Sequence, residues 1–115
     1  WYAGWADDMI KAGGIWVSPL EVEEVLREHP AVADCAVIGA PDLDGLEKPM
    51  AFVIVNDGYA ASSALEHELQ QYVRSRLAHY KYPRWVRFVD DLPRTASGKV
   101  QRYRLRAQVQ EEMRR

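Results

Sequence analysis

The sequence predicts one α+β domain of 115 residues, in which a small three-stranded sheet is flanked by helices and preceded by a short two-stranded hairpin. Two observations support this prediction. Apolar runs rich in β-branched residues alternate along the chain with segments whose apolar residues recur at helical spacing. Clusters of turn-forming residues separate them. This order favours a sheet covered by helices around one modest core.

The first element is a predicted hairpin, in which residues 7–11 and 15–17 flank the pair Gly13–Gly14. Tight turns of this kind need a positive φ, which glycine adopts at no steric cost. The hairpin therefore fits the start of the chain.

A helix should follow, because Ser18 suits the N-cap, Pro19 suits the first helical position, and Glu21 can complete a capping box. Its apolar stripe consists of Val22, Val25 and Leu26. The pair His29–Pro30 should end this helix.

Strands are predicted over 31–39, 50–55 and 85–89, and the turn-rich segment 40–45 separates the first two. Between the second and third strands, Ser63 and Glu66 form a further capping box that opens a longer helix, which should end near Tyr80. Its apolar face consists of Leu65, Leu69, Tyr72, Val73 and Leu77. A terminal helix of weaker pattern is expected over 103–113.

The composition is typical of a soluble globular protein, with 28% charged and 48% hydrophobic residues. No apolar run approaches the roughly 20 residues of a membrane-spanning helix, and no secretory signal is visible, so we expect no membrane partner. The single cysteine, Cys35, lies among apolar residues and is expected to be a buried thiol. A cytoplasmic location is expected, and a chain that opens at Trp1 is expected to belong to a longer one.

The net charge of −2 conceals a strong asymmetry along the chain. Residues 1–73 hold 3 Lys or Arg against 13 Asp or Glu, whereas residues 74–115 hold 12 against 4. A basic segment of this kind attracts phosphate-bearing ligands, including nucleotides, coenzyme A and nucleic acids. On charge alone, this segment is equally compatible with a solvated basic face that binds no ligand.

Segment 92–102 is the most unusual stretch, because three cations and two hydroxyl groups surround Gly98. It is not a Walker A phosphate loop, since Pro93 and Val100 occupy the positions that would need glycine and a hydroxyl residue. Judged alone, the segment is compatible with an exposed basic loop that binds nothing.

Three stretches together resemble the C-terminal domain of the adenylate-forming enzymes, which include acyl-CoA synthetases, peptide-synthetase adenylation domains and luciferases. PRTASGKVQR resembles the final signature of this family, and YAGWADDMIKAGGIWVSPLEVE resembles the hinge signature that begins its C-terminal domain. EVLREHPAVADCAVIGAPD, between them, is similar to the segment that follows the hinge. Within the family, the sequence of the hinge stretch is most similar to that of benzoate-type CoA ligases.

The resemblance implies a mobile domain over residues 1–115, with the hinge and hairpin at 5–18 and a catalytic lysine loop at 92–102. It also implies an ATP-dependent ligase. A carboxylic acid would attack ATP to give an acyl-adenylate, and coenzyme A would then displace AMP. ATP, coenzyme A and Mg²⁺ would be bound mainly by a larger N-terminal domain of the same protein, and the isolated 115-residue domain would be inactive.

Residue roles follow from the same resemblance. Lys99 matches the catalytic lysine of the first step, where its ammonium would offset developing charge. Asp7 matches the hinge, and Gly14 matches a glycine that approaches the pantetheine arm. Lys81 and Arg84 stand where CoA ligases contact the phosphates of the coenzyme. Without the resemblance, these would be a solvated carboxylate, a turn glycine and solvated cations.

One position departs from the family pattern, because Trp5 stands where an arginine near the nucleotide is usual. This substitution puts one nucleotide or hinge contact in doubt. No metal site is expected, since His29, His67 and His79 are too scattered. The alternative function is a noncatalytic basic nucleic-acid-binding or interaction module, but no RNA-binding aromatic pair or GXXG loop supports it.

Overall fold

The computed structural model describes residues 9–12 and 14–114. Its elements, in chain order, are β1 (Ile10–Ala12), β2 (Ile15–Val17), α2 (Pro19–Arg27), β3 (Val32–Pro41), β4 (Glu47–Val55), α3 (Ser63–Arg74), the 3-10 helix η1 (His79–Lys81), β5 (Trp85–Phe88) and α4 (Arg102–Met113). This order and the α+β class are the predicted ones.

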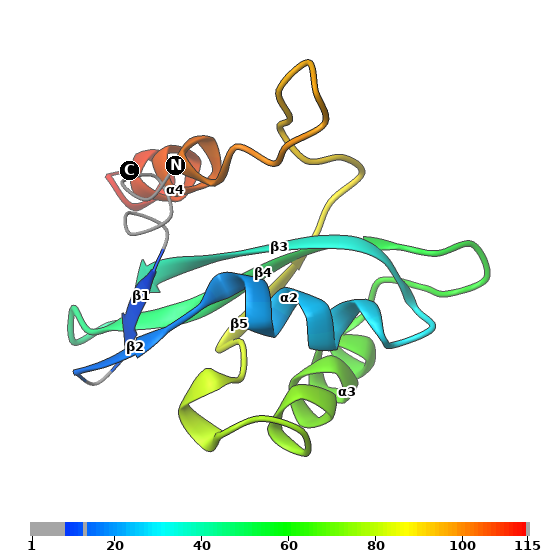
Figure 1. Ribbon diagram of the computed structural model, residues 1–115, viewed down its shortest axis with the longest axis horizontal. Coiled ribbons are helices and arrows are strands. Elements are labelled where there is room, and N and C mark those ends of the chain that lie inside the picture. The colour runs from blue at the N-terminus through cyan, green and yellow to red at the C-terminus, as the bar shows by residue number, and fades with distance from the viewer. Residues whose placement is uncertain (1–8, 13, 115) are drawn as a thin grey trace.

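The main sheet has three strands in the order β3-β4-β5. β3 and β4 are antiparallel, whereas β5 runs parallel to β4 after α3 has crossed one face of the sheet. Helices α2 and α3 cover that face, and α4 covers the other (Figure 1). The sheet is therefore buried on both faces.

Two apolar clusters fill the two interfaces, and successive residues of β3 and β4 alternate between them, as the pleat requires. The cluster under α2 and α3 includes Cys35, Val37, Ala51, Val53, Leu26 and Leu69. The cluster under α4 includes Ala36, Ile38, Phe52, Leu105 and Val109. Burial on both faces explains why β3 and β4 are continuous apolar runs rather than alternating ones.

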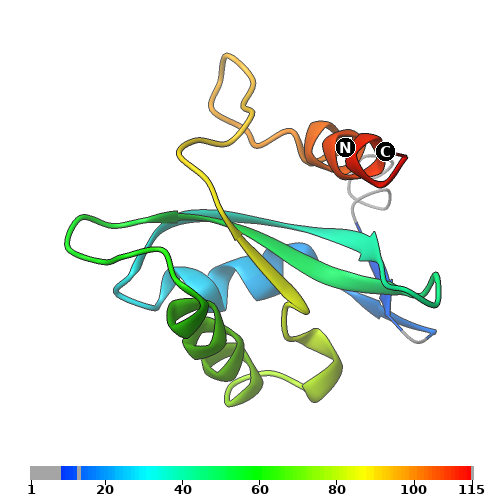
Figure 2. The same ribbon diagram turned by 180° about the vertical axis from the view of Figure 1, so that it is seen from behind.

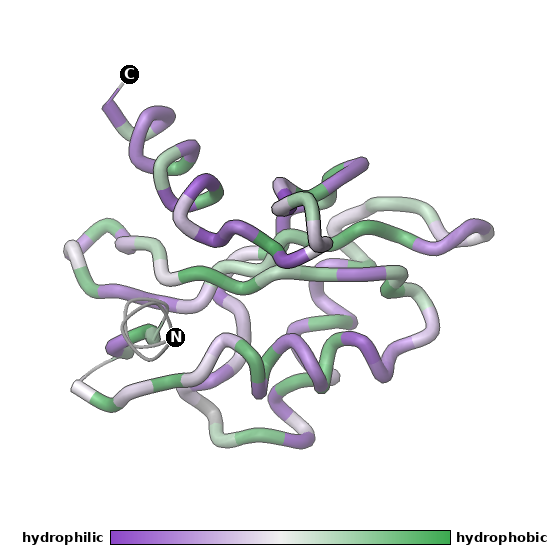
Figure 3. Tube along the Cα trace, turned by 45° about the horizontal axis from the view of Figure 1, so that its top comes forward, coloured by the Kyte–Doolittle hydropathy of each residue, from purple (hydrophilic) through white to green (hydrophobic). Residues whose placement is uncertain are grey.

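Helix α4 buries only two of its residues, Leu105 and Val109, and its trace is mainly hydrophilic (Figure 3). This narrow contact accounts for the weak apolar pattern in the sequence of this helix.

The β1–β2 hairpin is joined to the main sheet by a carboxylate of β4. The Lys11 N–H donates to Glu47 Oε1 at 2.7 Å. Glycine at position 39 leaves room for this side chain, because a Cβ there would lie only 2.6 Å from Glu47 Cδ. Gly39 thus permits the close approach that holds the hairpin.

The predicted N-cap of α3 is wrong by one residue, and the predicted capping box does not form. Ser62, not Ser63, is the N-cap, and its Oγ accepts from the Leu65 N–H at 3.1 Å. The carboxylate of Glu66 instead accepts from the Val86 N–H at 3.0 Å. Because β5 is an edge strand, that N–H needs a partner from outside the sheet.

Two helix ends also differ from the expectation. Ser18 occupies the N-cap of α2, but its side chain makes no capping hydrogen bond. Helix α3 ends at Arg74 rather than near Tyr80, and the Ser75 hydroxyl donates to the Tyr72 carbonyl at 2.7 Å. Hydrogen bonds of this kind compete with continuation of a helix.

Cys35 should be chemically inert in the folded chain. It is fully buried, and burial raises the pKa of its thiol to about 12, although the charge of Arg27 acts in the opposite direction. We therefore expect iodoacetamide at pH 8 to label Cys35 slowly in the native chain and rapidly in guanidinium chloride, as mass spectrometry would measure. Equal labelling rates in both conditions would contradict the burial of this thiol.

Candidate functional site

The segment around Lys99 forms a tight hairpin rather than an irregular loop. The Gly98 N–H donates to the Thr95 carbonyl at 2.9 Å, and the Thr95 N–H donates to the Lys99 carbonyl at 2.8 Å. An isolated bridge pairs Arg94 with Val100. Gly98 has a φ of +90°, a conformation in which glycine is strongly favoured. Lys99 directly follows this turn.

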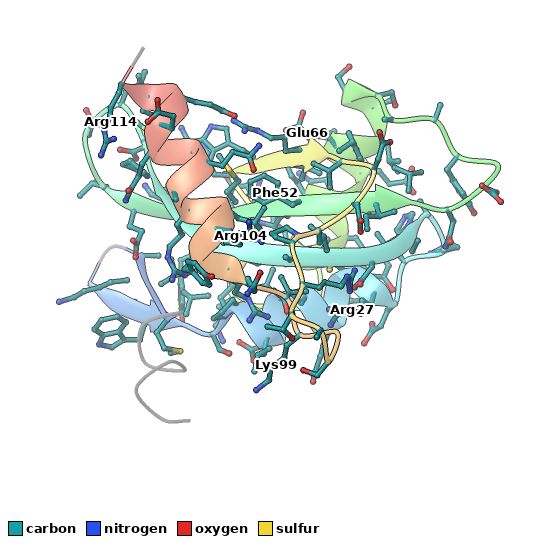
Figure 4. The ribbon with its side chains drawn as sticks, turned by 90° about the horizontal axis from the view of Figure 1, so that it is seen from above. Arg27, Phe52, Glu66, Lys99, Arg104 and Arg114 are labelled. Carbon is teal, nitrogen blue, oxygen red and sulfur yellow. The ribbon has the colours of Figure 1, made fainter. Side chains whose placement is uncertain are left out.

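Hydroxyl groups make further bonds within the hairpin. The Thr95 Oγ1 accepts from the Lys99 N–H at 3.1 Å and lies 3.0 Å from the Ser97 Oγ. The Lys99 side chain itself is exposed, and its ammonium has no partner among the residues that the structure describes. Figure 4 shows it directed away from the sheet. The backbone of Lys99 is thus held while its charge remains available to an anionic ligand.

The chain entering the hairpin is anchored to β3. Arg94 Nη2 donates to Asp34 Oδ2, and the other oxygen of Asp34 accepts from Arg27 Nε at 3.1 Å and from the Cys35 N–H at 2.8 Å. Partial burial acts against ionisation of this carboxyl group. The hydrogen bonds from Cys35 and Arg27 and the two guanidinium charges outweigh burial, so the pKa of Asp34 is below its ordinary value.

The chain leaving the hairpin is anchored to α2. Arg102 binds Glu23 with two hydrogen bonds, Nε to Oε2 at 3.0 Å and Nη2 to Oε1 at 2.6 Å. The Glu23 side chain is only 1% exposed and also accepts from the Val37 N–H at 2.7 Å. This N–H lies on the open edge of β3, so a single carboxylate binds an edge strand and the start of α4.

Sequence reasoning missed the roles of Glu23, Asp34 and Arg27. One signal was available, because Glu23 lies on the same side of α2 as Val22 and Leu26 and is therefore a charged residue within an apolar stripe. For Asp34, the sequence carries no comparable signal, since an isolated aspartate in a strand has many possible partners.

Gly14 occupies the β1–β2 turn with a φ of +85°, which confirms the predicted turn geometry. A Cβ at this position would have no heavy atom within 4 Å among the described residues. Among the described residues, no atom therefore covers this side of Gly14. Trp5, Asp7 and Gly13 lie outside the described residues, so their predicted roles remain predictions.

Lys81 makes an ion pair that the sequence did not predict, with Nζ 2.6 Å from Glu21 Oε1 of α2. This hydrogen bond and the charge of Glu21 raise the pKa of Lys81 above its ordinary value. Arg84 is exposed, and its backbone is tied down on both sides, since its N–H donates to Pro49 and its carbonyl accepts from Gln70. The Lys81 side chain is thus held against α2, whereas these bonds hold only the backbone of Arg84.

The candidate residues do not converge on one site. The Lys99 hairpin lies on the α4 side of the sheet, whereas η1 and the start of β5 lie on the side of α2 and α3 (Figures 1 and 2). The β1–β2 turn is at one end of the domain. Within residues 9–12 and 14–114, no three His, Cys, Asp or Glu residues are grouped to hold a metal ion. No helix in this described part is long and apolar enough to cross a membrane.

Comparison with known proteins defines the class of this domain. Residues 21–99 match the family model of the AMP-binding enzyme C-terminal domain. The matched range includes both Glu23 and Asp34 and ends on Lys99. The chain belongs to this family.

Individual relatives narrow the similarity to acid–CoA ligases. The chain is 55% identical to the benzoate–CoA ligase of Thauera aromatica over 92% of its own length and 20% of that protein. A 4-hydroxybenzoate–CoA/benzoate–CoA ligase of Rhodopseudomonas palustris is 50% identical over similar shares. The chain therefore spans about one fifth of the length of these relatives.

Two solved structures of acid–CoA ligases are also similar to this chain. The crystal structure of an anthranilate–CoA ligase in complex with anthranoyl-AMP superimposes with a TM-score of 0.86 at 51% identity, over 90% of this chain and 20% of that one. A benzoate–CoA ligase from Burkholderia xenovorans LB400 gives a TM-score of 0.80 at 51% identity, over 88% and 20%.

Removing the Glu23 carboxylate should strongly destabilise the chain. In Glu23→Ala, Arg102 and the Val37 N–H lose a buried partner, and breaking a buried ion pair in this way costs about 3–5 kcal/mol. Glu112→Ala removes an exposed pair with Arg87 and should cost about 1 kcal/mol or less. Urea unfolding of both variants would measure the two losses. Similar losses would show that Glu23 contributes no more than a surface charge.

The lowered pKa of Asp34 makes its contribution to stability dependent on pH. This contribution is fully present above the ordinary value of 3.8 and is lost as the pH falls through the lower value of the folded chain. The difference in melting temperature between the parent chain and Asp34→Asn should therefore shrink between pH 6 and pH 2. Circular dichroism would measure it, and a constant difference would contradict the ion pairing of Asp34.

Proposed function

We propose that this chain is the mobile C-terminal domain of an ATP-dependent acid–CoA ligase, which forms an acyl-adenylate and then transfers the acyl group to coenzyme A. The observation that carries the proposal is the 55% identity to a benzoate–CoA ligase across 92% of the chain. The exposed ammonium of Lys99 on a hydrogen-bonded hairpin supports it, because such a cation can approach a ligand bound by another domain.

In the first half-reaction, Lys99 would act at the ATP site of the larger N-terminal domain. The carboxylate of the acid attacks the α-phosphorus of ATP, a P–O bond forms, and pyrophosphate leaves. Negative charge accumulates on the phosphoryl oxygens as this occurs, and the Lys99 ammonium would stabilise it. Its attachment to a hydrogen-bonded turn favours a defined approach.

In the second half-reaction, the domain would rotate about Asp7 and present the β1–β2 hairpin instead. The coenzyme A thiol then attacks the acyl carbonyl and AMP leaves. Gly14 would allow the pantetheine arm to pass close to the backbone, which agrees with the open space around it. Lys81 and Arg84 would bind phosphates of the coenzyme, although Lys81 would have to share its charge with Glu21.

The acid is proposed to be aromatic, such as benzoate, because relatives and solved neighbours that share at least half of their aligned residues with this chain carry aryl-acid ligase names. Mg²⁺ would accompany ATP and be bound mainly by the N-terminal domain, and the enzyme would be cytoplasmic. A noncatalytic nucleic-acid module has no specific observation in its favour.

The two half-reactions should depend on different residues. In the full-length enzyme, Lys99→Ala should slow pyrophosphate release by about 100-fold or more, while conversion of a supplied acyl-adenylate and coenzyme A to thioester should change little. Gly14→Leu should have the opposite effect, because its side chain would obstruct the thiol arm. Single-turnover assays of each step, with benzoate as the acid, would measure both effects.

Gly58→Leu is the matched control for Gly14→Leu. Gly58 also has a positive φ, +91°, and open space around it, so the substitution introduces the same kind of backbone strain in a different loop. It should leave both half-reactions nearly unchanged. Equal losses in both assays for Lys99→Ala and Gly14→Leu would argue for purely structural roles and against the proposal.

A further inference from the structure

We propose that Asp34 is a positioning residue for Lys99. Two ion pairs attach the hairpin that bears Lys99: Asp34–Arg94 attaches it to the sheet, and Glu23–Arg102 attaches it to α2. This inference rests on the proposed function, in which Lys99 acts in acyl-adenylate formation. It assigns a role in the reaction to a residue of β3 that lies outside the hairpin.

Two anchors enclose the hairpin. Arg94 precedes the turn and Arg102 follows it, and each guanidinium binds a carboxylate of an element packed in the core, Asp34 on β3 or Glu23 on α2. The Gln101 N–H also donates to the Pro93 carbonyl at 2.8 Å, which closes the base of the hairpin. With both ends held, the position of the turn relative to β3 is restricted.

Arg27 joins the two anchors into one network. Its Nη2 lies 3.8 Å from Glu23 Oε1 and donates to the Cys35 carbonyl at 3.2 Å, while its Nε binds Asp34. Figure 4 shows Arg27 beside the hairpin that bears Lys99. The carboxylate of Asp34 therefore balances two guanidinium groups, and its removal would leave Arg27 and Arg94 facing each other without an intervening anion.

This arrangement differs from an ordinary surface ion pair. Asp34 is partly buried and accepts from two guanidinium groups and one backbone N–H. These three hydrogen bonds together hold its carboxylate in place. Exposed single ion pairs contribute little to stability. The cost of misplacing a catalytic group is large, since a displacement of about 1 Å can lower a rate by about 100-fold. A modest loosening of the anchor should therefore be visible in the rate.

The test is a double-mutant cycle of Asp34→Ala and Lys99→Ala in the full-length enzyme. Asp34→Ala should slow pyrophosphate release by about 10- to 100-fold, while thioester formation from supplied acyl-adenylate stays within about twofold. The double variant should be no slower than Lys99→Ala alone, because Asp34 acts only through the lysine. Asp34→Asn, which keeps an acceptor oxygen for Arg94, should recover part of the rate. It also provides a second variant if Asp34→Ala is too unstable to assay.

Glu112→Ala is the control, since it removes the exposed ion pair between Arg87 of β5 and Glu112 of α4 and should leave both half-reactions unchanged. Equal losses in the two half-reactions for Asp34→Ala, or multiplicative losses in the double variant, would overturn the positioning role. The positioning role would also be overturned if Asp34→Ala released pyrophosphate at the parent rate while Lys99→Ala released it slowly. Normal pyrophosphate release by Lys99→Ala would instead refute the proposed function itself.

Discussion

The rest of this domain depends on the hydrogen bonds of one buried carboxylate, that of Glu23. It begins on α2, satisfies the Val37 N–H on the open edge of β3, and binds the Arg102 guanidinium where α4 starts. A carboxylate that is 1% exposed is tolerated only when such partners compensate for its lost hydration. The same group thereby protects an edge strand, joins α2 to the sheet, and fixes the point from which α4 crosses the second apolar cluster.

The electrostatic network around Glu23 also explains how one small domain can present separate surfaces. Arg27 extends the network to Asp34, so the hairpin of Lys99 is held on the α4 side of the sheet. The β1–β2 hairpin is held by other contacts: Ile10, Ala12 and Val17 are buried in the cluster under α2 and α3, and the Lys11 N–H donates to Glu47. In the proposed function, a rotation of the whole domain would exchange one hairpin for the other without internal rearrangement, because different contacts hold each of them.

Apolar periodicity and turn chemistry were sufficient to predict the order of elements, because these signals are local. Boundaries were less predictable. The N-cap of α3 falls on Ser62 rather than Ser63, and Glu66 accepts from the Val86 N–H on β5 instead of capping its own helix. The segment around Lys99 was predicted to be a loop. It forms a hairpin through hydroxyl and backbone hydrogen bonds around Gly98. This hairpin is too short to produce the alternating pattern by which a strand is recognised in a sequence.

The sequence alone determined the fold class, the family resemblance, the positive φ at Gly14 and the burial of Cys35, because each depends on residue type and near neighbours. Only the tertiary structure decided which charges meet. Asp34 and Arg94 are 60 residues apart in the sequence, and so are Glu21 and Lys81. The packing of helices and strands determines which charged residues pair. The sequence around a charged residue does not indicate which distant residue will be its partner.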